Sequence, residues 1–306
     1  MNGFPRPLSG YVIGLSISES GESMERGFPL EQVNRVTLFV VSAMFGQGAS
    51  LIFGHDWRDD GVMQAIHGFA QQMQSPLPLT LAEAEAAGQP LLRNLLPWPD
   101  KPRLPVEDLE RLSSTLGVEQ AGLPGELKSV ENDALGAGPG SRIYRYLRAR
   151  GLTYLRHRLI GVSNARVCLG GRTADYTGRY PGVIEEALLA LRSRKPLYLA
   201  GFLGGATQQV ANAIAEKKMP EDFCPLTEVD DLYDKPPIKE SDASTWSDRK
   251  IDRDAVWSEM RQVGRKQFAA MNGLTVEENE ELFHTPVLDR VVELILTGVS
   301  QLRPKG

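Results

Sequence analysis

The sequence has few cysteines and histidines, and those present form no metal-binding or redox pattern. Cys168 and Cys224 lie far apart, without a second cysteine or a histidine at ligand spacing, so neither a zinc site nor a disulfide framework is indicated. The 4 histidines include no HExxH pair. We therefore expect no bound metal, and Cys168, which lies within an apolar run, is expected in the core.

The sequence also lacks long apolar runs and basic clusters. No stretch approaches the ~18 apolar residues of a membrane span, and the opening MNGFPRPLSGYVIGL is not a basic leader followed by a long apolar run. The 34 basic and 39 acidic residues are interspersed and give a net charge of −5, which does not predict a cationic surface for DNA or RNA. We expect a cytoplasmic protein without membrane or nucleic-acid partners.

Two common nucleotide fingerprints are missing as well. No GxGxxG motif and no GxxxxGK[ST] motif follows any of the apolar strand-like runs. Their absence disfavours conventional NAD dehydrogenases and P-loop NTPases. No tightly held cofactor is expected.

What is present is an alternation of strand and helix patterns. Short β-branched and apolar runs predict strands, and apolar residues at helical spacing predict the helices between them. This order is typical of a Rossmann-like, doubly wound, mostly parallel α/β sheet. The expected strands are 10–18, 49–54, 164–171 and 195–202, and the expected helices are 30–46, 61–73, 142–163, 183–194 and 206–218.

Composition divides the chain further. Residues 1–225 are expected to form a nucleotide-binding domain, and 226–306, with amphipathic helices and polar connections, a helical C-terminal extension. Prolines and glycines crowd the region 85–140, which predicts loops and helices elaborating the sheet rather than core elements. Gly151 is a candidate interruption of the helix 142–163.

Four loops that contain glycine lie at the carboxyl ends of the expected strands. Their sequences are GLSIS, FGHDWRDDGVM, LGGRTADYTGRYPGVIEE and GFLGGAT. One glycine pair is often only a turn, but ligands of open parallel sheets bind at the carboxyl ends of the strands, where helix N-termini attract phosphate. The sequence therefore predicts a nucleotide or nucleoside-phosphate ligand. The expected binding residues are Gly14, Ser16, Ser18, Gly54, His55, Asp56, Asp60, Gly61, Met63, Gly170, Gly171, Arg172, Gly178, Gly182, Gly205 and Thr207.

The order of these motifs resembles the SLOG superfamily, which includes Lonely Guy, lysine-decarboxylase-like and Smf/DprA proteins. The resemblance covers roughly residues 10–75 and 150–215. It implies a divergent member, because about ten extra residues separate the glycine pair from the PG-xx-EE turn. The matching residues are Gly54, Gly61 and Met63 for the GGxxGxM loop, Arg156 for the helix arginine, and Gly170, Gly171 and Glu185 or Glu186 for the PGGxGTxxE element.

The resemblance implies catalytic roles for Glu185, Glu186 and Arg156. A carboxylate near the anomeric carbon stabilises an oxocarbenium-like state. An arginine donates two parallel hydrogen bonds to a phosphate group, a role that Arg172 could share with Arg156. Glutamates at a helix start also interact favourably with the helix dipole without any chemistry. Likewise, Asp59, Asp60 and Gly61 are also consistent with an ordinary turn and helix cap. For Gly204, Gly205 and Thr207 a helix cap is the first interpretation and a phosphate cradle the second.

Three functions remain open at this point. The first is hydrolysis of the N-glycosidic bond of a nucleoside monophosphate. The second is sensing without turnover, for example of an NAD-derived signal, as the resemblance to conflict-system members of the superfamily implies. The third is a purely structural or protein-binding domain, which leaves the repeated glycine loops unexplained. A homodimer is expected from the resemblance, and the apolar helix 30–46 fits one.

Overall fold

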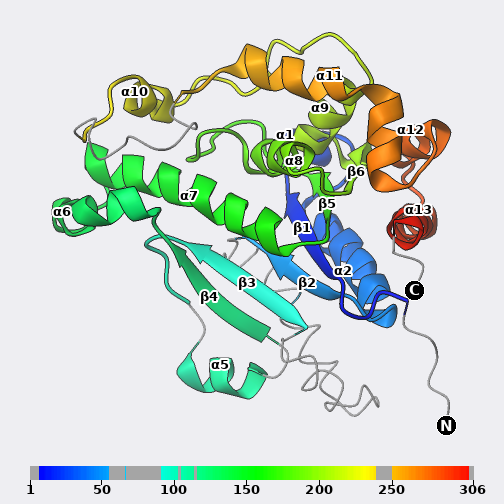
Figure 1. The fold of residues 1–306 in the computed structure, drawn as a ribbon, viewed down its shortest axis with the longest axis horizontal. Helices are drawn as coiled ribbons and strands as arrows, with labels where there is room; N and C mark the ends of the chain where they lie inside the picture. Colours follow the sequence, from blue (N-terminus) through cyan, green and yellow to red (C-terminus); the bar gives the residue numbers. More distant parts are fainter. Residues whose placement is uncertain are drawn as a thin grey trace.

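The fold is that of a computed structural model, which describes residues 7–54, 66, 91–102, 105–113, 116–238 and 250–302. Its centre is a six-stranded sheet in the order β4-β3-β2-β1-β5-β6, in which every described pair is parallel (Figure 1). The strands are β1 (Val12–Ser18), β2 (Ser50–Phe53), β3 (Leu92–Pro97), β4 (Leu116–Gly122), β5 (Ala165–Gly170) and β6 (Leu197–Ala200).

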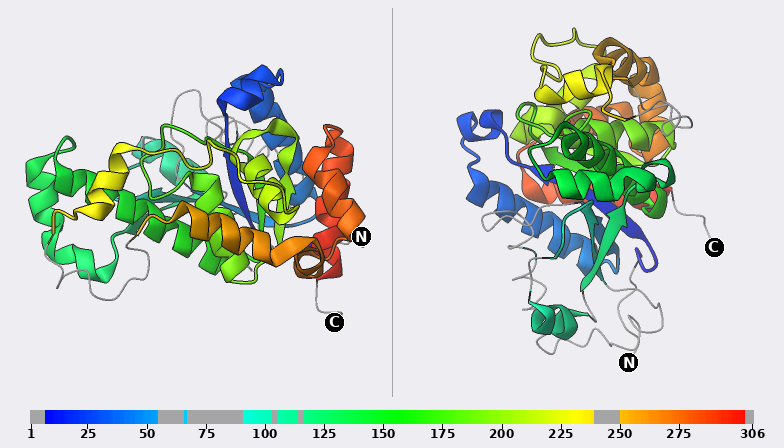
Figure 2. Two further views of the ribbon diagram at one scale, coloured as in Figure 1. Left: turned by 90° about the horizontal axis from the view of Figure 1, so that it is seen from above. Right: turned by 90° about the vertical axis from the view of Figure 1, so that its left-hand side faces the viewer.

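Helices cover both faces of the sheet, as the views in Figures 1 and 2 show. On one face lie α2 (Leu30–Gly46) and α13 (Leu288–Gln301), and on the other lie α7 (Arg142–Val162), α8 (Gly182–Arg192) and α9 (Gly205–Ile214). The expected Rossmann-like doubly wound fold is therefore confirmed. The remaining elements are α1 (Gly21–Glu25), α5 (Val106–Leu112), η1 (Gly125–Val130), α6 (Glu131–Ala137), η2 (Gly201–Leu203), α10 (Glu228–Asp234), α11 (Arg253–Asn272) and α12 (Val276–His284).

The region 85–140 differs from the expectation of loops and helices, because it supplies two strands of the sheet. β3 pairs with β2 and β4 pairs with β3, and Leu92, Leu95 and Leu96 of β3 are buried. The prolines of this region flank the strand: Pro97 is its last residue, and the LRNLL segment before it retains every N–H donor. Prolines at a strand end do not interrupt the ladder, so their density misled the prediction.

Helix α7 also differs from the expectation, since it continues through Gly151. A Cβ at Gly151 would lie 3.4 Å from Cβ of Trp98, which follows β3 and is buried. A glycine inside a helix costs about 1 kcal/mol relative to alanine. That distance is an ordinary van der Waals contact, so Gly151 packs against Trp98 without interrupting the helix.

The C-terminal helices pack onto the sheet domain. Leu282 of α12 and Val291 and Ile295 of α13 belong to the same buried cluster as the strands, and α11 packs along α9. A domain boundary near 225 stays a prediction. None of the helices in the described ranges is long and apolar enough to cross a membrane.

The apolar face of α2 is covered within this chain. Val36, Val40 and Met44 are buried against the sheet, and α13 packs beside the helix. This face therefore gives no support to the expected homodimer, which stays a prediction.

Candidate functional site

The strand order reverses direction at β1, which lies between β2 and β5. Loops that leave neighbouring strands in opposite directions open a crevice at this point of a doubly wound sheet. A cavity of about 300 Å³ lies there, beside the ends of β1 and β2. It is lined by Leu15, Ser16, Ile17, Ser18, Phe53, Gly54, Leu152, Leu155, Arg156, Arg172, Asp175, Tyr176, Thr177, Gly178, Gly182, Val183 and Glu186.

About half of the expected site residues lie around this cavity. Those that line it are Ser16, Ser18, Gly54, Arg156, Arg172, Gly178, Gly182 and Glu186. Those that do not are Gly14, Gly170, Gly171, Glu185, Gly205 and Thr207. Outside the described residues lie His55, Asp56, Asp60, Gly61 and Met63, together with the expected helix 61–73 apart from Ile66.

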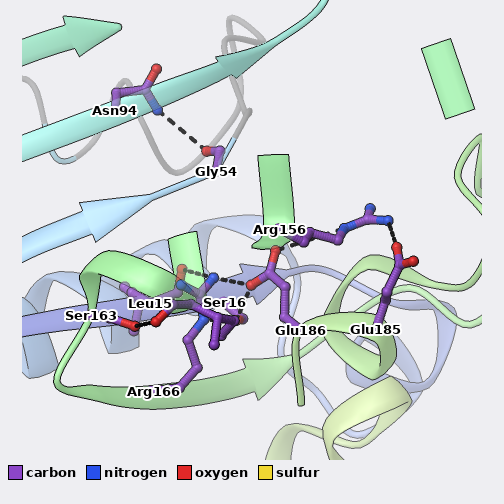
Figure 3. Close-up of polar contacts among 10 residues, drawn as sticks. Leu15, Ser16, Gly54, Asn94, Arg156, Ser163, Arg166, Glu185 and Glu186 are labelled. Carbon is purple, nitrogen blue, oxygen red and sulfur yellow. Dashed lines mark hydrogen bonds and ion pairs between the residues drawn. The ribbon is translucent and has the colours of Figure 1, made fainter. Parts of the chain in front are cut away.

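Glu186 lines the cavity from the first turns of α8, as Asp175 does from the loop before that helix. Figure 3 shows the Glu186 carboxylate with its contacts to Ser16, Arg166 and Arg156. Its Oε2 accepts short hydrogen bonds from Ser16 Oγ of β1 and Arg166 Nη2 of β5. Its Oε1 lies 3.9 Å from Nε of Arg156. A buried carboxylate needs such compensation of its charge, and here two guanidinium groups from different elements provide it.

Arg166 is the partner that our sequence reasoning missed. It is fully buried, its Nε donates to Ser16 Oγ at 2.6 Å, and its Nη1 has no hydrogen-bond partner among the described residues. Burial, and to a smaller extent the nearby Arg156, lower the pKa of Arg166 to about 10 from its ordinary value of 12.5. The sequence signal was an arginine within the apolar strand ARVCLG, which requires a buried acid elsewhere in the chain.

Glu185 points away from the cavity and holds Arg156. Its Oε1 accepts from Thr153 Oγ1 at 2.8 Å, and its Oε2 forms a short ion pair with Nη1 of Arg156. Both partners come from α7, so this contact ties α8 to α7. Of the two glutamates left open by the sequence, Glu186 lines the cavity and Glu185 does not.

Several glycines of the expected site make room for arginine side chains. A Cβ at Gly178 would lie 2.8 Å from Nη1 of Arg156, and one at Gly182 would lie 3.0 Å from its Nη2. At Gly14 a Cβ would collide with Arg166. These positions accommodate guanidinium groups of the chain itself, which explains part of the glycine-rich pattern without a ligand.

The Gly204–Gly205 loop already binds a carboxylate of the protein itself, that of Glu22. The N–H of Gly205, at the start of α9, donates to Oε2 of Glu22 at 2.7 Å. Arg26 pairs with Glu22 and donates to the carbonyl of Phe202 at 3.1 Å. At Gly204, where φ is +76°, a Cβ would lie 2.6 Å from Cδ of Glu22. The cap interpretation therefore describes this loop in the structure.

The start of α8 is different, because Gly182 and Val183 line the cavity. The first N–H groups of a helix have no partner within the helix and carry the positive end of its dipole. Arg156 lies next to them, and Arg172 lines the same cavity. The cavity thus combines these hydrogen-bond donors with the carboxylates of Glu186 and Asp175.

The thiols and acids of the described residues form no metal centre. No group of three or more His, Cys, Asp or Glu side chains in this part of the chain is arranged to hold an ion. Cys168 and Cys224 are both free and buried, which confirms the expected core position of Cys168.

Comparison with known proteins adds the family. The SLOG cluster2 family model matches residues 7–282, from the segment before β1 to the last turn of α12. The comparisons with curated proteins and with solved structures gave no match. The match spans the sheet, the switch-point cavity and most of the C-terminal helices, and it supports a nucleotide-related role in general terms. The chain therefore belongs to the SLOG cluster2 family.

Proposed function

We propose that the protein binds a nucleotide or nucleoside phosphate in the switch-point cavity. The observation that carries this proposal is the convergence of the α8 N-terminus, Arg156 and Arg172 on one cavity at the crevice of a parallel sheet. Family membership supports a ligand of the nucleotide type.

The cavity offers different chemistry to each part of such a ligand. Phosphate oxygens would accept from the N–H groups of Gly182 and Val183 and from the arginines. Ribose hydroxyls would donate to Glu186, which already accepts from two groups and has a second oxygen toward Arg156. Ser18 Oγ accepts from the backbone N–H of Arg172 at 3.0 Å, which fixes the loop beside the phosphate position.

Hydrolysis of an N-glycosidic bond is the second candidate. The observation in its favour is that Glu186 presents a carboxylate to the cavity, since a carboxylate near the anomeric carbon stabilises an oxocarbenium-like state. The same carboxylate, however, is engaged by Arg166 and Ser16, which reduces the negative charge available to a reaction centre. The geometry thus favours binding without turnover over hydrolysis.

The test combines melting and product analysis. The protein is titrated with a panel of nucleoside monophosphates and NAD⁺ while the melting temperature and base release are followed. A melting shift of several degrees without product is expected. Glu186→Gln and Arg156→Lys should abolish most of that shift, whereas Glu259→Gln, an exposed carboxylate paired with Arg192 on α8, should keep it.

The outcomes separate the two candidates. Base release that disappears in Glu186→Gln would establish hydrolysis and overturn a purely binding role. Neither a shift nor a product with any nucleotide of the panel would contradict both candidates.

A further inference from the structure

A second cavity, of about 1030 Å³, adjoins the first. The consecutive residues Asp175, Tyr176 and Thr177 line both cavities. They belong to the loop Arg172–Pro181, which contains the extra residues that distinguish this chain from the resembled motif. One loop therefore forms a wall of both spaces.

The loop is held by hydrogen bonds to Pro225, which precedes α10, and to the residues just before α11. The hydroxyl of Tyr176 donates to the carbonyl of Pro225 at 2.6 Å, and Arg179 Nε donates to the carbonyl of Lys250 at 2.9 Å. The N–H of Asp252 donates to the hydroxyl of Tyr180 at 2.8 Å. These contacts order the loop that bounds both cavities, and an ordered site lowers the entropic cost of binding.

Arg253, at the start of α11, adds to this anchoring. Its guanidinium pairs with Asp230 at 2.7 Å and donates to the carbonyls of Cys224 and Pro225, beside the Tyr176 hydroxyl. The C-terminal helices thus hold the segment that borders the second cavity. Arg253 acts on the site through this loop and lines neither cavity.

The second cavity carries no excess of positive charge. Its arginines are paired, Arg148 with Asp100 and Arg145 with Glu228, and Asp175 adds a further acid. Apolar and aromatic side chains complete it, among them Tyr144, Tyr176, Leu226 and Leu232. This lining suits an uncharged ring with hydroxyl groups. The arginines of the first cavity are also paired, Arg156 with Glu185 and Arg172 with Glu19, and Asp175 lines that cavity too. What distinguishes the first cavity is the N-terminus of α8, whose N–H groups beside Arg156 suit phosphate.

We propose that the two cavities form one site for a ligand of the dinucleotide class: a nucleotide in the first, its phosphate bridged to a second nucleoside in the second. The inference rests on the proposed function and narrows its ligand class. Ligand sites generally span about 300–1,000 Å³. The first cavity alone is at the lower end of that range, and the second supplies the room for another ring.

The test compares a dinucleotide with its halves. Calorimetry measures the Kd of AMP, nicotinamide mononucleotide and NAD⁺ with wild-type protein, Leu226→Trp and Leu135→Trp. Leu226 lines the second cavity and is 80% exposed, so tryptophan there reduces the cavity without disturbing the core. Leu135 on α6 is 48% exposed, lines neither cavity and provides the matched control.

We expect NAD⁺ to bind at least about tenfold tighter than either half, because joining two bound parts makes the second contact intramolecular. Leu226→Trp should remove most of that gain and leave AMP within about twofold of wild type, and Leu135→Trp should change neither. NAD⁺ binding no tighter than AMP, or tighter binding that Leu226→Trp leaves intact, overturns this inference. If AMP binding still depends on Arg156 in that case, the proposed function stands; no binding of any probe overturns both.

Discussion

At the scale of single residues, the main feature of the site is a buried ion pair. Arg166 is fully buried in β5, and its charge is compensated by Glu186, which also faces the cavity. Removing one member of a buried pair leaves the other charge without compensation and costs about 3–5 kcal/mol, while removing both together costs much less. The same ion pair thus fixes the position of the Glu186 carboxylate and makes substitution of Glu186 strongly destabilising.

We therefore predict strong coupling between Arg166→Met and Glu186→Gln. Each single variant should lower the free energy of unfolding by several kcal/mol, and the double variant by clearly less than their sum. Urea unfolding of the four proteins of this cycle measures the coupling. The matched control is the exposed pair Arg192 and Glu259, where each change should cost under about 1 kcal/mol. Additive costs at Arg166 and Glu186 would contradict this account of the site.

At the scale of elements, two helix N-termini in similar positions of the fold have different surroundings. The start of α8 opens into the switch-point cavity, whereas the start of α9 is closed by the carboxylate of Glu22. Both follow a strand and a glycine-rich loop, so the local pattern does not distinguish them. The difference depends on α1, which brings Glu22 to the chain 183 residues later.

Removing Glu22 tests this view of α9. Glu22→Ala should lower the free energy of unfolding by about 1 kcal/mol, through the lost cap and the lost interaction with the helix dipole. Its melting temperature should then rise more steeply with added phosphate than that of wild type, since the N–H of Gly205 becomes available. Glu31→Ala, which removes an exposed carboxylate from the first turn of α2, is the control. Equal phosphate dependence in all three proteins would show that Glu22 does not occupy an anion position.

The sequence predicted those helices and strands that show a clear pattern within one continuous segment. The spacing of Val33, Val36, Val40 and Met44 gave α2 its bounds, and β1 and β5 followed from β-branched runs. β3 was missed because prolines at its margins outweighed the short apolar run between them. β4 was missed because its sequence, LGVEQAG, contains glycines and polar residues and no apolar run. Arg166 was missed because its acid partner lies on another element, and no local signal pairs residues across a sheet.

At the scale of the whole molecule, burial of ionisable groups limits stability in alkaline solution. Burial raises the pKa of the Cys168 thiol to about 11 from 9.0, against opposing effects of Arg166 and Ser16. The folded protein then keeps a proton that the unfolded chain loses between these values. By linkage, the free energy of unfolding is unaffected by this group below about pH 9 and falls as pH rises toward 11.

Cys168→Ala should make that fall shallower. The measurement is the slope of the unfolding free energy against pH between about 9 and 11, compared with the slope below pH 9, where the two proteins should run parallel. The slope is the readout because the variant also loses packing in the core. Identical alkaline slopes would indicate that the thiol does not contribute.

Helix α7 borders both cavities and fixes the distance between them. Arg145 and Arg148 on this helix border the second cavity, and Arg156 borders the first. At 1.5 Å per residue, Arg145 and Arg156 are separated by about 16 Å along the helix axis. Because one continuous helix carries both sets of side chains, the spacing of the two cavities cannot change unless that helix bends. A ligand of the proposed dinucleotide class would therefore have to match this length.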